Sequence, residues 1–170
     1  MYSVNAPVTG GVERLASELF PELTTFERIR ERHSLLIKRL GELDAAQVGP
    51  DRLAERLRPV LSGTPAFEVR ITEIDYFTDT PRGSSPVVYL AVESPELERL
   101  HRRLVGAFGA VDELEGESYV HHVTLARGGN VEAAERLAAI DVEPVSWTVS
   151  ELLLWNQEYR EVARRIRLPA

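Results

Sequence analysis

The sequence predicts an α+β fold in which two pseudo-symmetric lobes with antiparallel-rich sheets surround a central cleft and carry helices on their outer faces. Three observations support this fold class. The chain has 170 residues, of which 44% are hydrophobic and 28% charged, as is typical of a globular domain. Segments that alternate apolar and polar residues are interspersed with segments of helical periodicity. The order strand, helix, strand, helix, paired strands occurs roughly once in each half, without a linker, so we expect a single domain over residues 1–170.

The first half of the chain is predicted to contain two strands and two helices. Apolar residues spaced three and four apart indicate the first helix, with Thr9 as its candidate N-cap and Pro21 near its end. Pro50 suits the first turn of the second helix. The predicted elements are a strand at 1–8, a helix at 12–20, a strand at 32–40, a turn-rich connection at 41–49 and a helix at 51–61.

The second half is predicted to be richer in strands. A long alternating segment slips in phase near Ile74, which indicates a β-bulge. Ser94 is the predicted cap of the helix that follows the first hairpin. The predicted elements are strands at 66–79 and 86–92 joined by a turn at 80–85, a helix at 95–108, an acidic loop at 109–116, a strand at 117–127, a helix at 131–140 and a closing hairpin of strands at 145–155 and 159–168.

Composition excludes several classes of protein. The sequence has no cysteine, so disulfides and thiolate metal sites are ruled out. No apolar run approaches the roughly 18–20 residues of a membrane span, and residues 1–8 lack the features of a secretory signal, so we expect a cytoplasmic protein without a membrane partner. The net charge of −7 disfavours a duplex-binding protein, whereas a small or short anionic substrate held by local groups is compatible with it. We expect a monomer without a cofactor, and no phosphate-loop motif indicates ATP use.

Two histidine motifs carry most of the functional signal. In His122-Val123-Thr124-Leu125, strand alternation places the imidazole of His122 and the hydroxyl of Thr124 on the same face. The other motif begins at His33, in the strand predicted at 32–40. If the two strands lie opposite each other, one from each lobe, two proton-transfer groups flank one pocket, as phosphodiester cleavage without a metal requires.

Other histidines and the tryptophans are interpreted as structural. His121 is expected to face away from His122, and the pair lacks the carboxylate or thiolate partners of a zinc site. His101, in the stretch with Arg102 and Arg103, is interpreted as a surface residue of its helix. Trp147 and Trp155 have the spacing of one strand face and are interpreted as core residues in preference to base-stacking platforms.

With both histidine segments placed, the chain resembles the 2H phosphoesterase superfamily, in particular the 2′-5′ RNA ligase-like proteins with 2′,3′-cyclic phosphodiesterase activity. That family carries two H-x-T/S-x motifs, one per lobe, and the second is intact here as His122-Val123-Thr124-Leu125. The segment Leu40-Gly41-Glu42 looks like the family's exit turn, and Tyr159 looks like the aromatic residue that often opens its last strand. The order of elements matches over nearly the whole chain.

The resemblance implies a site and a reaction. His33 and His122 would be the catalytic acid and base, in either assignment, and no metal would take part. Substrates would be RNA ends or nucleotides with a 2′,3′-cyclic phosphate, with reversible 2′-5′ joining as a related reaction. The implied substrate-binding residues are Thr124, Ser34, Arg127 and Tyr159.

The first motif departs from the family pattern. Its hydroxyl is adjacent to the histidine, as Ser34, and position 35 is leucine. Strict alternation points Ser34 away from His33, and it also points Arg127 away from the cleft. Two interpretations remain open: a bulge at Ser34 restores the geometry, or the motif has lost its phosphate donor. In the second case the chain would be a non-catalytic module that binds RNA ends or nucleotides.

Overall fold

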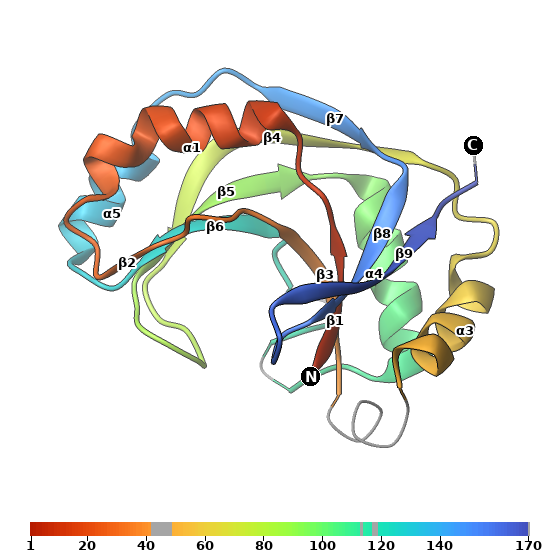
Figure 1. The fold of residues 1–170 in the computed structure, drawn as a ribbon. Coiled ribbons are helices and arrows are strands. Elements are labelled where there is room, and N and C mark those ends of the chain that lie inside the picture. The colour runs from red at the N-terminus through yellow and green to blue at the C-terminus, as the bar shows by residue number, and fades with distance from the viewer. Residues whose placement is uncertain (42–48, 113, 117–118, 170) are drawn as a thin grey trace.

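The structure is a computed structural model that describes residues 1–41, 49–112, 114–116 and 119–169. It is an α+β fold with two antiparallel sheets (Figure 1), which confirms the predicted fold class. Within these ranges the helices are α1 (Gly10–Leu23), α3 (Pro50–Leu61), α4 (Pro95–Phe108) and α5 (Val131–Ala138). The strands are β1 (Tyr2–Ala6), β2 (Arg28–Ile29), β3 (Leu35–Leu40), β4 (Phe67–Phe77), β5 (Val87–Glu93), β6 (His122–Arg127), β7 (Val145–Val149), β8 (Glu151–Asn156) and β9 (Glu161–Arg167). None of these helices is long and apolar enough to cross a bilayer.

The two sheets form the two lobes. One has four strands in the order β3-β1-β8-β9, and the other has five in the order β2-β6-β5-β4-β7. Helices α3 and α4 pack against the four-stranded sheet, and α1 and α5 pack against the five-stranded sheet (Figure 1). Both sheets combine strands from the two ends of the chain, so the lobes do not correspond to its two halves.

The predicted strand at 145–155 is in fact two strands in different sheets. β7 pairs with β4 at the edge of the five-stranded sheet, whereas β8 pairs with β1 and β9 in the other. The chain passes from one sheet to the other at Ser150, and the buried positions change there from the odd-numbered Val149 to the even-numbered Leu152 and Leu154. No Gly or Pro marks this change, which is why the sequence reads as one strand. Trp147 and Trp155 therefore do not share a strand face, and the prediction that they do is wrong.

The prediction that His33 lies in a strand is also wrong. β3 begins at Leu35, and residues 30–34 are irregular. The chain leaves the five-stranded sheet after the amide N–H of Arg30 donates to the carbonyl of Leu125 at 2.8 Å, and it enters the other sheet at Leu35. His33 thus lies in a crossover between the lobes. The second histidine strand is shorter than predicted and begins at His122; residues 117–118 of that prediction, and 42–48 of the predicted turn, lie outside the described residues.

Bulges determine which side chains face inward. In β4 the register shifts at Thr72, so the predicted bulge near Ile74 is confirmed within two residues. Further shifts occur in β3 at Ile37 and in β6 at Leu125. Each inserts one extra residue and exchanges the faces of the residues that follow it.

Capping at the helix termini follows the sequence in part. The hydroxyl of Ser94 accepts the backbone N–H of Leu97 at 3.2 Å, as predicted for the cap of α4. Thr9 is the residue before α1, but its side chain makes no capping bond, and the helix continues past Pro21. His101 on α4 is 3% exposed, so its interpretation as a surface residue is wrong. It shares the buried face of Leu97, Leu100 and Leu104, spaced three and four apart.

Candidate active site

A cavity of about 1200 Å³ lies between the two sheets. Its lining includes His33 and Ser34 from the crossover and His122 and Thr124 from β6. The structure therefore brings four of the six predicted site residues to one cavity, with one histidine segment from each side. Because the core side chains of both sheets point to the opposite faces, toward the helices, the inner faces are available to line it.

His122 is fixed at the start of β6. Its Nδ1 lies 2.7 Å from the carbonyl oxygen of Val120. A carbonyl only accepts, so Nδ1 carries the proton, and Nε2 of the neutral ring is an acceptor without a hydrogen-bond partner among the described residues. The ring is held edge-on against Phe77, with centroids 5.4 Å apart, and lies tilted against Tyr89 at 5.1 Å. Backbone and aromatic contacts thus set both the tautomer and the ring orientation.

The surroundings of His122 favour its neutral form. Burial lowers the pKa of His122 below its usual value, and the positive charges of Arg39, Arg127 and Arg30 lower that pKa further. The hydrogen bond to the Val120 carbonyl acts in the opposite direction without overturning the shift. At neutral pH the ring is therefore an unprotonated imidazole with a free Nε2.

His33 is anchored by a carboxylate. Its Nδ1 lies 2.8 Å from Oε2 of Glu13, a residue in the first turn of α1. The imidazole side chain is 6% exposed, so it is held within the crossover and does not extend into solvent. Glu13 accepts the Nδ1 proton, and Nε2 has no hydrogen-bond partner in the part of the chain that the structure describes. The two histidines are thus anchored alike, through Nδ1.

Ser34 reaches the cavity without a bulge. Alternation does not govern residues 33 and 34, because both precede β3, and both line the cavity while Leu35 is fully buried in the core. The Ser34 hydroxyl accepts a hydrogen bond from Nδ2 of Asn5 at 3.4 Å, and Ser3 donates to Oδ1 of Asn5 at 2.7 Å. The Ser34 proton is therefore free to be donated to a ligand.

Arg127 is turned by the bulge in β6. Thr124 pairs with Tyr89 and, beyond the extra residue Leu125, Arg127 pairs with Val87, which is on the same face of β5 as Tyr89. Arg127 is thus on the same face of the sheet as Thr124. Its Nη2 donates to the carbonyl of Arg82 at 3.2 Å, and its guanidinium packs closely on Gly83, whose φ of +79° and missing Cβ leave the room it needs. Arg127 does not contribute to the cavity lining itself.

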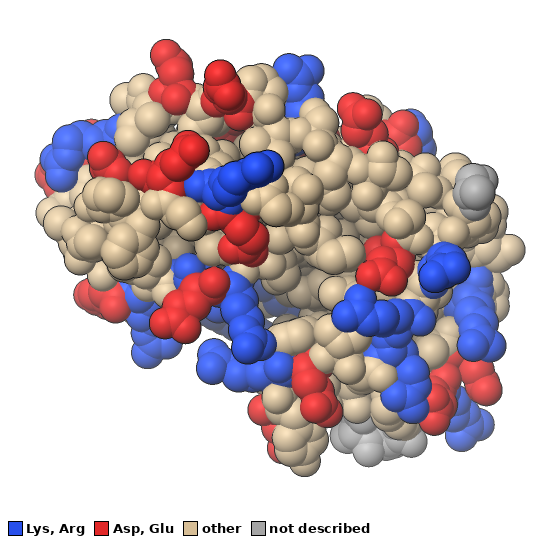
Figure 2. Space-filling model, turned by 45° about the horizontal axis from the view of Figure 1, so that its top comes forward, with Lys and Arg blue, Asp and Glu red and all other residues tan. Residues whose placement is uncertain are grey.

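Positive charge is concentrated inside the cavity. Arg30, Arg32, Arg39 and Arg160 line it, against the carboxylates of Glu13 and Glu31. The chain as a whole carries a net charge of −7, and arginines are interspersed with Asp and Glu over the face drawn in Figure 2. An anion is therefore attracted to this cavity specifically.

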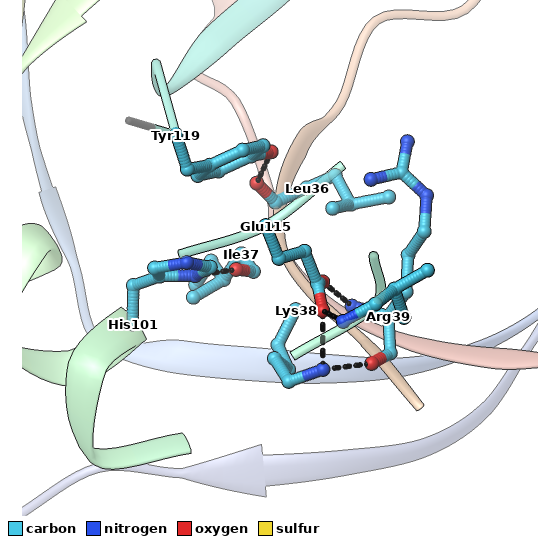
Figure 3. Close-up of polar contacts among 8 residues, drawn as sticks. Leu36, Ile37, Lys38, Arg39, His101, Glu115 and Tyr119 are labelled. Carbon is cyan, nitrogen blue, oxygen red and sulfur yellow. Dashed lines mark hydrogen bonds and ion pairs between the residues drawn. The ribbon is translucent and has the colours of Figure 1, made fainter. Parts of the chain in front are cut away.

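A buried network holds the Arg39 end of the cavity. β3 is an edge strand, and its outer backbone groups are covered by side chains (Figure 3). Nζ of Lys38 bonds to the carbonyl of Arg39 and lies 2.5 Å from Oε1 of Glu115, while the amide of Arg39 donates to Oε2 of Glu115 at 2.7 Å. Lys38 and Glu115 side chains are both fully buried. This ion pair fixes the backbone from which the Arg39 side chain extends.

Two further side chains complete this edge. The hydroxyl of Tyr119 donates to the carbonyl of Leu36 at 3.1 Å, and Nδ1 of His101 donates to the carbonyl of Ile37 at 2.7 Å (Figure 3). Tyr119 lines the cavity next to the segment that anchors His122. The four-stranded sheet and the start of β6 are thus joined by side-chain to backbone hydrogen bonds.

A comparison with known protein families matches residues 34–161 to the 2′-5′ RNA ligase superfamily. The chain belongs to this superfamily. The matched range begins directly after His33 and includes His122 and Thr124. No curated protein sequence matched. Membership places the chain among phosphoesterases and RNA ligase-like proteins, and it confirms the resemblance inferred from the two motifs.

Solved structures show the same fold. TT0787 of Thermus thermophilus is 20% identical with a TM-score of 0.64, covering 98% of this chain and 97% of its own. E. coli LigT complexed with 3′-AMP is 15% identical with a TM-score of 0.66, at 99% and 98% coverage. A phosphoesterase structure is 17% identical with a TM-score of 0.63, also at 99% and 98%. LigT has also been crystallised with NADP+ and with ATP. At these identities the likeness establishes the superfamily fold alone.

Tyr159, the remaining residue implied by the superfamily resemblance, lies apart from the histidines. It is in the turn between β8 and β9, its side chain is 68% exposed, and it does not contribute to the cavity lining. Its neighbours Gln157 and Arg160 do line the cavity. The turn is therefore at the rim of the site, but the aromatic ring is not the part of it that faces inward.

Several residues of the site were not identifiable from the sequence. Glu13 is 20 positions from His33 and comes from a helix that packs on the other lobe, so no local pattern signals the contact. Arg39 reaches the inner face only because of the bulge at Ile37. The charged segment that contains Arg30 and Arg32 reads as solvent-exposed, whereas it forms the crossover wall of the cavity.

Low pH is expected to destabilise the folded protein, because His121 is buried in its neutral form. The ring is 5% exposed and packs against His101 and Tyr119. Burial, followed by the nearby His101 and His122, lowers the pKa of His121 from 6.5 to about 3. Because the folded state holds the neutral form, its stabilisation is complete above about pH 6.5 and is lost as the pH falls toward 3, by about 4 kcal/mol.

Urea unfolding at a series of pH values measures this effect. The His121→Phe variant keeps an aromatic ring against Tyr119 but cannot titrate, so its stability should fall less steeply than that of the wild type between pH 6.5 and 3. Equal slopes for the two proteins would show that His121 is not responsible.

Proposed function

We propose that the protein is a metal-independent phosphoesterase that hydrolyses 2′,3′-cyclic phosphates of RNA ends or nucleotides, with reversible 2′-5′ joining as a related reaction in which an RNA 5′-hydroxyl replaces the water. The observation that carries this proposal is the matched anchoring of His33 and His122. Each donates Nδ1–H to a protein acceptor and leaves Nε2 without a partner in the described residues, and both line the same cavity. Two such nitrogens can exchange protons with one substrate from two sides.

The surroundings of the two rings favour different roles. His122 is held neutral by burial and by nearby arginines, so its Nε2 can accept the proton of the attacking water. His33 is hydrogen-bonded to the carboxylate of Glu13, which compensates the positive charge of a ring that acts as an acid. In hydrolysis, the water oxygen bonds to phosphorus while one ribose oxygen leaves and takes the proton of His33. The product is a ribose phosphomonoester. In joining, an RNA 5′-hydroxyl takes the place of the water and the two histidines keep these roles. The roles exchange in the reverse of joining, in which a 2′-5′ linkage is cleaved and the cyclic phosphate forms.

Hydroxyls and arginines of the cavity suit the phosphate oxygens. Thr124 projects from the same face of β6 as His122, and Ser34 retains a proton to donate. Arg39 and Arg30 add positive charge as negative charge develops on the non-bridging oxygens. These groups are fixed before the substrate arrives, since each is part of a strand or of the hydrogen-bonded crossover.

Nucleotides bound by a protein of the same fold have the charge that the proposed site favours. E. coli LigT, which shares the fold, has been crystallised with 3′-AMP, NADP+ and ATP. Two of these molecules carry more than one phosphate group, which matches a cavity with four arginines in its lining. Nucleotides with a terminal cyclic phosphate are therefore the first substrates to test.

Phosphorus NMR of 2′,3′-cyclic nucleotides incubated with the purified protein tests the proposal. We expect the cyclic phosphate signal to be replaced by that of a phosphomonoester, at the same rate with and without EDTA. A rate that EDTA abolishes would contradict the metal-independent mechanism. Affinity for cyclic phosphate ends without any product would instead favour the non-catalytic binding module.

A further inference from the structure

We infer that the β8 side of the cavity is a subsite for the terminal nucleoside of an RNA end: the base stacks on Trp155 and the phosphate on its 5′ side binds Arg160. This inference rests on the proposed function and extends it to the substrate class, because it makes an oligonucleotide end a better substrate than a cyclic mononucleotide. Both residues line the same cavity as His33 and His122.

The register of the four-stranded sheet defines the floor of the cavity. Ser3 pairs with Arg39 on one side and with Trp155 on the other, so the three side chains form a row across β3, β1 and β8. A second row consists of Leu36, Asn5 and Leu153. All six residues line the cavity. Because neighbouring strands lie about 4.8 Å apart, Trp155 is separated from Arg39 by roughly 10 Å across the floor.

The floor changes character from one side to the other. The β3 side carries Arg39, whose charge acts on His122, whereas the β8 side carries Leu153 and Trp155. Beyond Trp155, in the turn after β8, Arg160 supplies a second positive charge. The order across the cavity is therefore cation, aromatic ring, cation. A nucleotide within a chain has the complementary order of phosphate, base-bearing nucleoside, phosphate.

Trp155 differs from the other tryptophan in its surroundings. Nε1 of Trp147 donates to the carbonyl of Pro7 at 3.2 Å, and its side chain packs against the core. Trp155 is half-buried and lines the cavity, and its indole makes no hydrogen bond to the described residues. An indole face in a cavity of this kind is a sequence-tolerant platform for a base.

The turn that carries Arg160 is fixed by hydrogen bonds. Oδ1 of Asn156 accepts the amides of Glu158 and Tyr159 at 3.0 and 3.3 Å, and the amide of Gln157 donates to the carbonyl of Met1 at 2.9 Å. Arg160 has a φ of 53°, a conformation that non-glycine residues rarely adopt. This backbone directs Arg160 to the rim of the cavity, while Tyr159 points to solvent.

The cavity is larger than one small ligand requires. Its volume of about 1200 Å³ exceeds the roughly 300–1,000 Å³ that is usual for a drug-sized ligand. A site for a cyclic mononucleotide alone uses Trp155 but leaves Arg160, at the far end, without a ligand group. A terminal nucleotide with the phosphate that joins it to the rest of an RNA accounts for both ends.

Steady-state kinetics with two substrates tests the subsite: adenosine 2′,3′-cyclic phosphate, which has no 5′-phosphate, and a diadenosine dinucleotide with the same cyclic end. Trp155→Ala should raise KM for both by about 5-fold or more, the loss of one base stack, with kcat retained. Arg160→Ala should raise KM by about 3-fold for the dinucleotide alone. Trp147→Phe and Arg167→Ala, at residues outside the cavity lining, serve as controls.

Two conservative variants distinguish the loss of base stacking and phosphate binding from a defect in folding. Trp155→Phe and Arg160→Lys should restore most of the lost affinity, which a merely structural defect would not explain. Unchanged KM values for both substrates in Trp155→Ala and Arg160→Ala, with wild-type turnover, would overturn the subsite while the proposed function stands.

A binding measurement keeps the two proposals distinguishable. In the Trp147→Phe variant Trp155 is the only tryptophan, so its fluorescence reports on the subsite directly. A diadenosine dinucleotide that ends in a 3′-phosphate should quench it, and adding Arg160→Ala should weaken that binding. Quenching in a protein without cyclic phosphate turnover would support the subsite and contradict the proposed function. Absence of quenching at saturating dinucleotide would contradict the subsite.

Discussion

Replacing His122 with alanine is expected to lower kcat for 2′,3′-cyclic phosphate hydrolysis by about 10²–10⁴-fold, the usual contribution of one positioned proton transfer. The variant loses the only ring nitrogen on β6 that is neutral, anchored and directed into the cavity. The side chain is partly exposed and lies outside the core cluster, so the fold should persist. Single-turnover assays followed by phosphorus NMR measure the rate, and circular dichroism measures the thermal midpoint.

His33→Asn is the matched variant on the other side of the cavity. It should show a loss of similar size, and the double variant should lose less than the product of the two single effects, because both groups act in one step. Wild-type turnover in His122→Ala would falsify the two-histidine mechanism. Turnover lost in His122→Ala but retained in His33→Asn would assign the chemistry to β6 alone.

The second large effect concerns the buried ion pair beneath Arg39. Lys38 is the only lysine of the chain, and its side chain and that of Glu115 are fully buried. Lys38→Met should destabilise the protein by about 3–5 kcal/mol, because it leaves an uncompensated carboxylate in the interior. Urea unfolding monitored by circular dichroism measures the change in the free energy of unfolding.

A double-mutant cycle tests whether the pair acts as a unit. In Lys38→Met with Glu115→Gln no charge is buried. The single amide oxygen keeps one of the two backbone hydrogen bonds that the carboxylate accepts, from Arg39 at Oε2 and from Val111 at Oε1. The double variant should therefore be more stable than either single variant, with a coupling energy of about 1–3 kcal/mol. Additive losses would mean that the two charges do not compensate each other.

Local patterns in the sequence were sufficient for most of the fold. Helical spacing of leucines identified α3 and α4, Ser94 marked the start of α4, and the slip in alternation located the bulge of β4. Alternation also placed His122 and Thr124 on one face of β6. These features depend on neighbours within a few residues, which is why the sequence alone reveals them.

Features that depend on the packing of distant segments were not predictable. The change of sheet at Ser150 reverses which residues are buried, but no Gly or Pro marks it, so β7 and β8 read as one strand. His33 lies in a crossover whose path is set by β2 and β3 together, and that path, not strand alternation, brings Ser34 to the cavity. The bulges of β3 and β6 turn Arg39 and Arg127 to the inner faces of the sheets. Neither bulge interrupts the apolar pattern of its strand clearly enough to be recognised in the sequence.

The position of β1 has a consequence for biosynthesis. β1 lies between β3 and β8, so during synthesis this strand acquires its second neighbour only when Glu151–Asn156 has been made. Until then one edge of β1 is unpaired and the apolar residues of the four-stranded sheet are incompletely covered. Assembly of this lobe is therefore a late, slow event that depends on contacts between distant parts of the sequence.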